Sequence, residues 1–170
     1  MTAPARVVVV MGVAGAGKST LGAALSASLG WVFIEGDDFH SEANRAKMRA
    51  GMPLTDEDRW GWLDALNGAC AAALSDGRSI VVACSALRAA YRRRLVRGFE
   101  DCARLVHLVV GEQEAARRVA GRSHFMPASL VPSQFAALES PSADERTLIV
   151  EGTLPVREVE ALVRAWPGLP

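Results

Sequence analysis

A run of four valines leads directly into a glycine-rich turn near the amino end of this 170-residue chain. The run, Val7–Val10, is typical of a central parallel strand that is buried on both faces. GVAGAGKS follows at residues 12–19 and fits the pattern GxxxxGK[ST]. Glycines in such a loop let backbone N–H groups turn inward to form a nest for an anion, and the next helix directs its positive end at the same place. The sequence therefore predicts a loop that binds the phosphates of a nucleoside triphosphate.

Each part of this loop has an expected task. We expect Lys18 to reach the β- and γ-phosphates and Ser19 to hold Mg²⁺. A glycine-rich turn that binds nothing is the alternative, but here a predicted strand precedes the motif and a predicted helix follows it, as phosphate binding requires. The predicted nucleotide-binding residues of the loop are Gly12, Val13, Ala14, Gly15, Ala16, Gly17, Lys18, Ser19 and Thr20.

Strand-like and helix-like segments alternate along the rest of the chain. Further strands are predicted over residues 31–36, 79–85, 103–111 and 146–152, and helices over 19–30, 55–74, 87–98, 112–121 and 155–166. This alternation predicts an α/β fold, in which helices cover both faces of a parallel sheet. The length and the lack of a repeat or linker predict a single domain over residues 1–170.

Composition argues against several classes of partner. Nineteen basic and nineteen acidic residues give a formal net charge of zero, so we expect no nucleic-acid-binding surface and no membrane-binding patch. Cys70, Cys84 and Cys102 are widely spaced and lie outside any CxxC or His/Cys cluster. They predict reduced thiols in a cytoplasmic protein rather than disulfides or a zinc site.

An acidic cluster, EGDDFH at residues 35–40, follows the second predicted strand. The carboxyl end of a parallel strand lies on the rim where such sheets bind ligands. A carboxylate that faces the γ-phosphate there can orient an attacking hydroxyl or accept its proton, and we expect Asp37 to do so. Alternatively, Asp37 or Asp38 caps a helix that starts near Ser41. No guanine-reading motif follows, and no later strand ends in a Walker-B aspartate, so a small kinase is favoured over a GTPase or a motor.

Four segments outside the generic loop resemble the gluconokinase family. They are GDDFH at 36–40, SEANRAKMRAGMPLTDEDRWGWL at 41–63, ACSALRAAYRRRLVR at 83–97 and GRSHFMPASLVPSQFAALESPSADE at 121–145. The resemblance runs in order from Met11 to about Glu145. It implies a three-layer P-loop kinase fold, as in shikimate and nucleoside-monophosphate kinases, with a five-stranded parallel sheet, a helical substrate insert at about 38–76 and a mobile lid at about 117–135. It also implies ATP- and Mg²⁺-dependent phosphorylation of D-gluconate at its 6-hydroxyl, and it is compatible with a homodimer.

Gluconate carries one carboxylate and five hydroxyls, so its site needs a guanidinium group and several short polar groups. Together with the resemblance, this predicts the substrate residues Asp37, His40, Arg45, Arg59, Ser85, Arg88 and His124. We expect Arg59 to clamp the carboxylate; its alternative is a salt bridge to Asp56 or Glu57 on the same helix. For Arg45 the alternative is a solvated helix face.

Two arginines of the predicted lid, Arg118 and Arg122, are four residues apart. We expect Arg122 to close over the phosphates and stabilise charge on the transferring group, and Arg118 to lie beside the adenine. An ordinary surface arginine is the alternative for Arg122. Lys18, Asp37 and Arg122 are thus the predicted catalytic residues.

Other bulky and charged residues are expected to have structural rather than functional roles. Residues 92–94, three arginines in a row, are expected on an exposed helix face, and Trp60 and Trp62 in the core. A role for Glu35 in the water shell of the metal is left open.

Two other functions remain open. One is a P-loop kinase of another small acceptor, such as shikimate, another sugar acid or a nucleotide. The other is a nucleotide-binding regulator without catalysis, which the acidic rim and the lid arginines disfavour because a switch needs no acceptor pocket.

Overall fold

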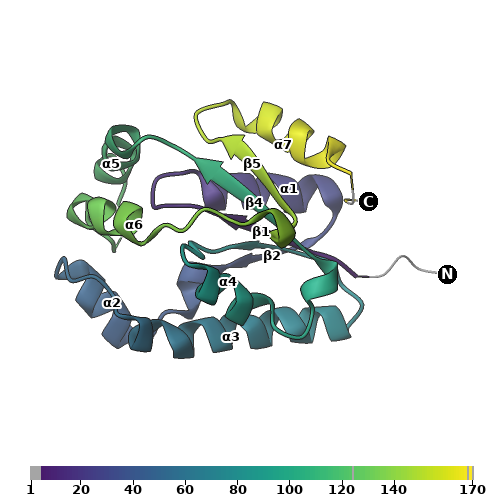
Figure 1. Cartoon of the computed structure of the whole chain (residues 1–170), viewed down its shortest axis with the longest axis horizontal. Helices are drawn as coiled ribbons and strands as arrows, with labels where there is room; N and C mark the ends of the chain where they lie inside the picture. The colour runs from purple at the N-terminus through teal and green to yellow at the C-terminus, as the bar shows by residue number, and fades with distance from the viewer. Residues whose placement is uncertain (1–4, 124, 168, 170) are drawn as a thin grey trace.

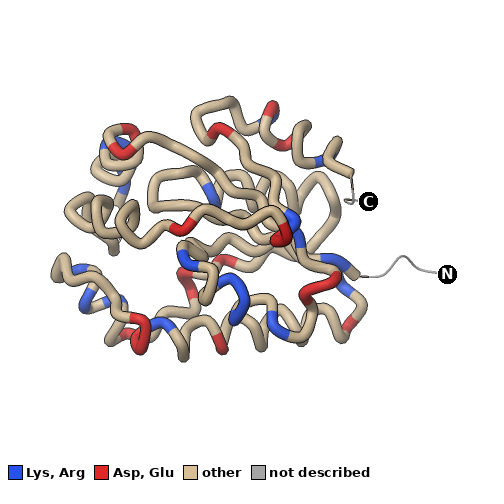
Figure 2. Tube along the Cα trace, in the orientation of Figure 1, with Lys and Arg blue, Asp and Glu red and all other residues tan. Residues whose placement is uncertain are grey.

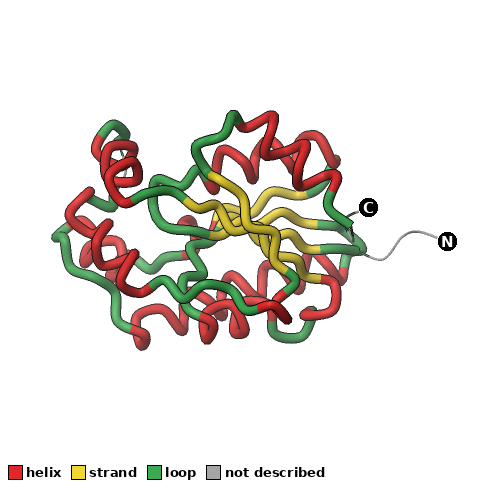
Figure 3. Tube along the Cα trace, turned by 45° about the horizontal axis from the view of Figure 1, so that its top comes forward, coloured by secondary structure: helices red, strands yellow, loops and turns green. Residues whose placement is uncertain are grey.

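A single five-stranded sheet, parallel throughout, runs through the centre of the molecule (Figure 3). The computed structural model describes residues 5–123, 125–167 and 169. The strands lie in the order β2-β3-β1-β4-β5. Their bounds are β1 Val7–Met11, β2 Val32–Glu35, β3 Ile80–Ala83, β4 Ala103–Val109 and β5 Thr147–Glu151. The expected five-stranded parallel sheet is confirmed.

Helices cover both faces of this sheet, as expected (Figure 1). α1 and α7 pack on one face, α3 and α4 on the other, and α2, α5 and α6 lie toward the end where the strands finish. The helix bounds are α1 Lys18–Leu29, α2 Glu42–Arg49, α3 Asp56–Ser75, α4 Ala89–Val96, α5 Glu112–Ala120, α6 Val131–Ala137 and α7 Val156–Ala165. The predicted insert contains α2 and α3, and the predicted lid overlaps the end of α5 and the first part of α6; motion of the lid stays a prediction.

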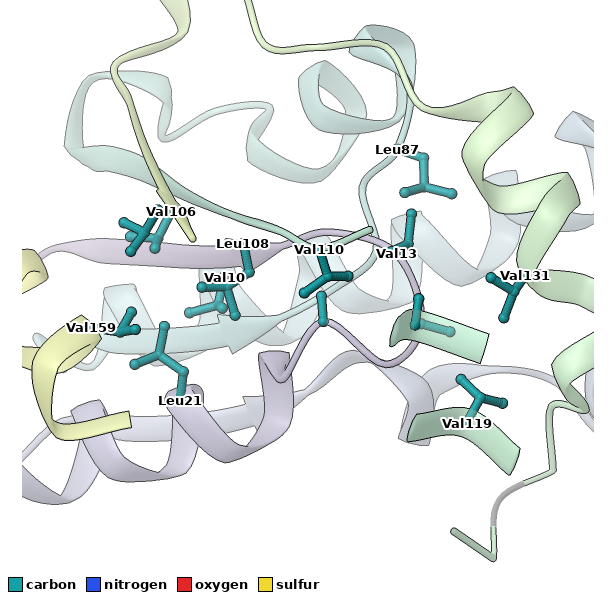
Figure 4. Packing of buried hydrophobic residues seen from close by; sticks show 14 of the residues in the cluster. Val10, Val13, Leu21, Leu87, Val106, Leu108, Val110, Val119, Val131 and Val159 are labelled. Carbon is teal, nitrogen blue, oxygen red and sulfur yellow. The ribbon is translucent and has the colours of Figure 1, made fainter. Parts of the chain in front are cut away.

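The β1 strand is the centre of two hydrophobic cores. All five of its side chains are fully buried. Because strand side chains alternate between faces, Val8 and Val10 pack toward α1 and α7, whereas Val7, Val9 and Met11 pack toward α3 and α4. Figure 4 shows the first of these cores, in which Val10 lies close to Leu108 of β4. Burial of each such side chain contributes roughly 1.5 to 3 kcal/mol, so the strand before the loop is held rigidly.

The long helix α3 begins at a capping box. The Asp58 N–H donates to the Thr55 hydroxyl (3.3 Å), and the Thr55 N–H donates to the Asp58 carboxylate (2.9 Å). Asp58 also accepts two hydrogen bonds from Lys47 of α2, at 2.7 and 2.8 Å, and these lower the pKa of its carboxyl group. The start of α3 and the helix before it are therefore joined into one unit.

Charged side chains link α3 to α4 as well. Figure 2 shows acidic and basic positions close together along these two helices. Arg94 makes two hydrogen bonds of 2.7 Å to Asp64, and Arg88 makes two of 3.2 Å to Asp56. Among the described residues, no helix is both long and apolar enough to cross a membrane.

The expectation that Arg92 lies on an exposed helix face is wrong. Arg92 is 1% exposed, and its guanidinium group donates to the carbonyl oxygens of Ala86, Leu87 and Glu139. It also donates twice to the carboxylate of Glu145, at 2.5 and 3.0 Å. The loop after β3 and the chain that returns from α6 are thus held together by one buried cation.

We predict that Arg92→Met lowers the free energy of unfolding by about 3 kcal/mol, because it leaves three carbonyls and a largely buried carboxylate without their donor. Urea denaturation measures this, and Arg93→Met, on the exposed neighbour, should change it by less than about 0.5 kcal/mol.

The destabilisation caused by Arg92→Met should be smaller in acid. Burial by itself would raise the pKa of Glu145, but the hydrogen bonds from Arg92 and from the Ser142 N–H outweigh it and hold this pKa below its usual 4.5. A depressed folded-state pKa stabilises the fold above pH 4.5, and this contribution is lost as the pH falls through the folded-state value. If the free energies of unfolding of wild type and Arg92→Met differ by the same amount at pH 7 and at pH 3, this assignment is contradicted.

Candidate functional site

The glycine-rich loop has a backbone that only glycine adopts readily. Gly12, Gly15 and Gly17 have φ angles of 144°, 80° and 100°. A Cβ atom on Gly12 would lie 2.6 Å from the carbonyl oxygen of Leu108, and one on Gly15 would lie 2.6 Å from that of Ala115. The loop therefore turns tightly while packed against β4 and α5.

The N-terminus of α1 faces the inside of this loop without a cap. No side chain of the described residues accepts a hydrogen bond at the Gly17 cap position, and the first turn contains no acidic residue. The first N–H groups of a helix have no partner within the helix, and they carry partial positive charge. Together with the loop, they form a site suited to phosphate groups.

A cavity, which we call the phosphate cavity, opens at this loop. Its lining residues are Gly15, Gly17, Lys18, Ser19, Thr20, Glu35, Asp37, Asp38, Arg45, Arg122 and Phe125. The Ser19 hydroxyl and three carboxylates give it oxygen ligands of the kind that Mg²⁺ prefers. Within the described part of the chain, no group of three or more His, Cys, Asp or Glu side chains is placed to hold a metal ion by itself. This donor set fits an ion that keeps waters and is shared with bound phosphates.

A second, mainly apolar cavity adjoins the first at Gly17 and Thr20. Its lining residues are Ala16, Gly17, Thr20, Leu21, Leu108, Arg118, Gly152, Leu154, Val156 and Val159. Arg118 forms part of one wall, and its guanidinium group donates to the carbonyl oxygens of Gly15 (3.2 Å) and Gly152 (3.0 Å). A flat apolar group attached to the phosphates would fit here, as predicted for adenine beside Arg118.

The acidic rim after β2 is a 3₁₀ turn, Gly36–Phe39, that several side chains hold in shape. Glu35 accepts a hydrogen bond from the Asp37 N–H (3.3 Å). Arg45 donates to the carbonyl oxygens of Asp37 (3.0 Å) and Asp38 (3.2 Å), so it braces the turn from α2. Ser41, rather than either aspartate, caps α2, with its hydroxyl accepting from the Asn44 N–H (3.1 Å). Capping of α2 therefore does not account for either aspartate.

A third cavity, which we call the insert cavity, lies between the loop, the insert and the lid region. Its polar lining residues are Lys18, Asp37, His40, Arg59, Ser85, Arg122, Ser133 and Gln134. Lys18, Asp37, Arg122 and Phe125 line both this cavity and the phosphate cavity. The three predicted catalytic residues thus lie where the two cavities meet.

Arg59 faces the insert cavity with unused hydrogen-bonding capacity. One of its terminal nitrogens donates to the Leu54 carbonyl (3.2 Å), but the Nε atom is buried and has no partner among the described residues. The ion pairs of the described residues do not include a bridge from Arg59 to Asp56 or Glu57; Asp56 instead binds Arg88 and the Tyr91 hydroxyl. A buried N–H without an acceptor is costly, so this guanidinium group is suited to a ligand carboxylate.

The other predicted substrate residues are divided between the cavity and its surroundings. Ser85 lines the insert cavity, whereas Arg88 is not among its described lining residues and is held by Asp56. His40 stacks on Trp62 with a centroid distance of 4.2 Å, and the Trp62 indole N–H donates to the Gly36 carbonyl at 2.8 Å. Trp62 is buried, as expected, and supports the rim turn. His124 lies outside the described residues.

Cys84 is buried next to the rim, and Lys18 is half-buried there. Burial lowers the pKa of Lys18; the charge of Asp37 opposes this shift and that of Arg122 adds to it. The Lys18 ammonium group donates to the Val13 carbonyl (3.0 Å), across the loop. Burial raises the pKa of Cys84 to about 12, and that of Cys70 likewise to about 12, so both remain neutral thiols at physiological pH.

We predict that Cys70 and Cys84 are not alkylated by iodoacetamide in the native protein at pH 8, because the thiolate is the reactive form and both side chains are buried. Peptide mass spectrometry after a short exposure measures this, with guanidinium-unfolded protein as the positive control. Rapid native labelling of Cys84 would show that the floor of the site is open to solvent.

Sequence reasoning missed Gln134 and Tyr91, which the structure places beside the candidate site. Gln134 lines the insert cavity on α6, a seven-residue helix that was not predicted. Tyr91 donates to Asp56, and the Arg59 guanidinium lies 5.3 Å from its ring centroid. Neither residue belongs to a sequence motif that indicates a function. Only the resemblance of the segments around them to the gluconokinase family pointed to this region.

Comparison with known proteins agrees with this geometry. A family model described as an AAA domain matches residues 7–140. The gluconokinase of Gluconobacter oxydans (strain 621H) is 45% identical over 148 residues, which cover 86% of this chain and 83% of that protein.

Two solved structures extend the similarity to three dimensions. An unliganded sugar kinase from Janibacter sp. HTCC2649 has a TM-score of 0.90 at 40% identity, covering 96% of this chain and 94% of that one. A gluconokinase from Sinorhizobium meliloti 1021 has a TM-score of 0.81 at 41% identity, covering 94% of this chain and 90% of that one. The expected three-layer P-loop kinase fold is confirmed.

Proposed function

This chain belongs to the gluconokinase family, and we propose that it transfers the γ-phosphoryl group of ATP to the 6-hydroxyl of D-gluconate. The observation that carries the proposal is the meeting of two cavities at Lys18, Asp37 and Arg122. One cavity suits phosphates, and the other has a guanidinium group and hydroxyls suited to a sugar acid. A regulator without catalysis has no use for the insert cavity.

In the proposed reaction, Asp37 orients the 6-hydroxyl and accepts its proton as the oxygen attacks the γ-phosphorus. Lys18 and Arg122 approach the same phosphoryl group from two sides and neutralise the charge on its oxygens. Most of the acceleration comes from positioning and electrostatics, since phosphoryl transfer asks little covalent chemistry of a protein. Ser19 would hold Mg²⁺, which would supply further neutralisation of the charge on the phosphates.

At the other end of the acceptor, Arg59 binds the gluconate carboxylate. Its buried Nε and a terminal nitrogen are the natural pair for a two-point contact. His40 and Ser85 line the same cavity and offer short polar contacts to the hydroxyls of the polyol. A carboxylate at Arg59 and a reacting hydroxyl at Asp37 fix both ends of a linear sugar acid.

The direct test is an acceptor screen that measures ADP release with gluconate, shikimate, other sugar acids and nucleosides, with the product identified by ³¹P NMR. We expect gluconate to give 6-phosphogluconate, and Lys18→Ala to abolish turnover while the circular dichroism spectrum stays native. Phosphorylation of a nucleoside without activity on gluconate would favour the rival kinase.

We predict that Asp37→Asn lowers kcat by roughly 10²- to 10⁴-fold, the usual range for loss of a general base. The amide keeps the size of the side chain, so the KM values for ATP and gluconate should change little. Asp144→Asn, at an exposed position in the 3₁₀ turn Ala143–Glu145 that lines neither cavity, is the control and should retain most of the activity.

For the carboxylate clamp, Arg59→Lys should raise the KM for gluconate about 10- to 100-fold, because an ammonium group cannot reproduce a two-point contact with a carboxylate. The KM for ATP should stay within a factor of two or so. Arg49→Lys, on the exposed face of α2, provides the same exchange away from the cavity. An unchanged KM for gluconate in Arg59→Lys would remove Arg59 from the substrate site.

A further inference from the structure

A hydrogen bond joins the glycine-rich loop to α6 across 120 residues of sequence. The N–H of Ala14 donates to the side-chain oxygen of Gln134 at 2.7 Å. Ala14 is the third residue of the GxxxxGK[ST] motif, and Gln134 lies in the predicted lid. Neither the proposed reaction nor the sequence motif assigns Gln134 a role.

This bond fixes which way the Gln134 amide points. A backbone N–H is a donor only, so the atom facing Ala14 must be the amide oxygen. The NH₂ group then points the other way, where its nitrogen lies 3.2 Å from the Met126 sulfur. A thioether is a weak acceptor, so the NH₂ group keeps donor capacity for an oxygen atom of a ligand.

The position of this donor relates it to the acceptor rather than to the nucleotide. Ala14 and Gln134 both line the insert cavity, and neither is among the described residues that line the phosphate cavity. Ala14 belongs to the loop that holds the transferring phosphoryl group, so a ligand group beside it lies near the reacting end of the acceptor. Arg59, on α3, is assigned to the carboxylate end.

We propose that Gln134 is a substrate-binding residue that reads a secondary hydroxyl near the reacting end of the polyol. Its oxygen is fixed by Ala14, and its NH₂ group donates to that hydroxyl. The acceptor is thereby aligned directly against the loop that holds the γ-phosphate. This inference rests on the proposed function, because it takes gluconate as the ligand of the insert cavity.

Two variants distinguish substrate binding by Gln134 from a purely structural hydrogen bond between the loop and α6. Gln134→Glu keeps an oxygen that accepts from Ala14 but has no NH₂ donor. Gln134→Met has a similar size and loses both hydrogen bonds. Gln113→Glu, at an exposed position on α5, is the control for the added negative charge.

The measurement is the steady-state KM for gluconate and for ATP in each variant. We expect both Gln134 variants to raise the KM for gluconate about three- to tenfold, the loss of one neutral hydrogen bond, with the control unchanged. If Gln134→Glu has the wild-type KM for gluconate and only Gln134→Met is impaired, Gln134 merely ties the loop to α6 and the proposal is wrong.

A set of 2-, 3-, 4- and 5-deoxygluconates identifies the hydroxyl. With the wild-type protein, the analogue that lacks the hydroxyl bound by Gln134 should bind more weakly than gluconate. With Gln134→Met, that analogue and gluconate should bind equally well, because the hydrogen bond is already lost. Equal losses for every analogue in both proteins would overturn the inference. If wild type does not phosphorylate gluconate at all, it is the proposed function that fails, so the two failures are distinguishable.

Discussion

The inward turn of the backbone at residues 12–17 is the constraint on which the rest of the site depends. Three glycines with positive φ form this turn, and two of them pack so closely against β4 and α5 that a side chain would collide with a carbonyl oxygen. The fully buried strand β1 aims the loop, and the uncapped start of α1 completes it. A rigid strand followed by a permissive turn thus presents backbone N–H groups to phosphates with no charged side chain required for the geometry.

A second constraint positions the Asp37 carboxylate, which we propose acts on the acceptor. The 3₁₀ turn after β2 is held by Arg45 from α2 and by the Trp62 indole from α3, so the insert that we propose binds the acceptor also shapes the turn carrying Asp37. The insert is in turn tied together through Asp58. Substrate binding and alignment of the proposed base therefore depend on the same packed unit.

The sequence predicted the features that are local. The valine strand and the glycine loop each depend on residues within a few positions of one another, and each was found where expected. It did not predict the buried Arg92–Glu145 pair or the Ala14–Gln134 bond, whose partners are 53 and 120 residues apart. Arg92 was misassigned because a run of three arginines resembles a solvated face, whereas its partners come from the loop after β3 and from the chain returning from α6. The ion pair between Arg88 and Asp56 was not predicted either, because its partners are 32 residues apart in the sequence.

The central claim is that the loop holds the triphosphate within reach of an alcohol bound at Asp37. A crystal structure with Mg²⁺, a non-hydrolysable ATP analogue and gluconate tests it most directly. We expect a 6-hydroxyl oxygen roughly 3 to 3.5 Å from the γ-phosphorus and hydrogen-bonded to the Asp37 carboxylate. Gluconate bound outside the insert cavity, or an Asp37 carboxylate turned away from the hydroxyl, would contradict it.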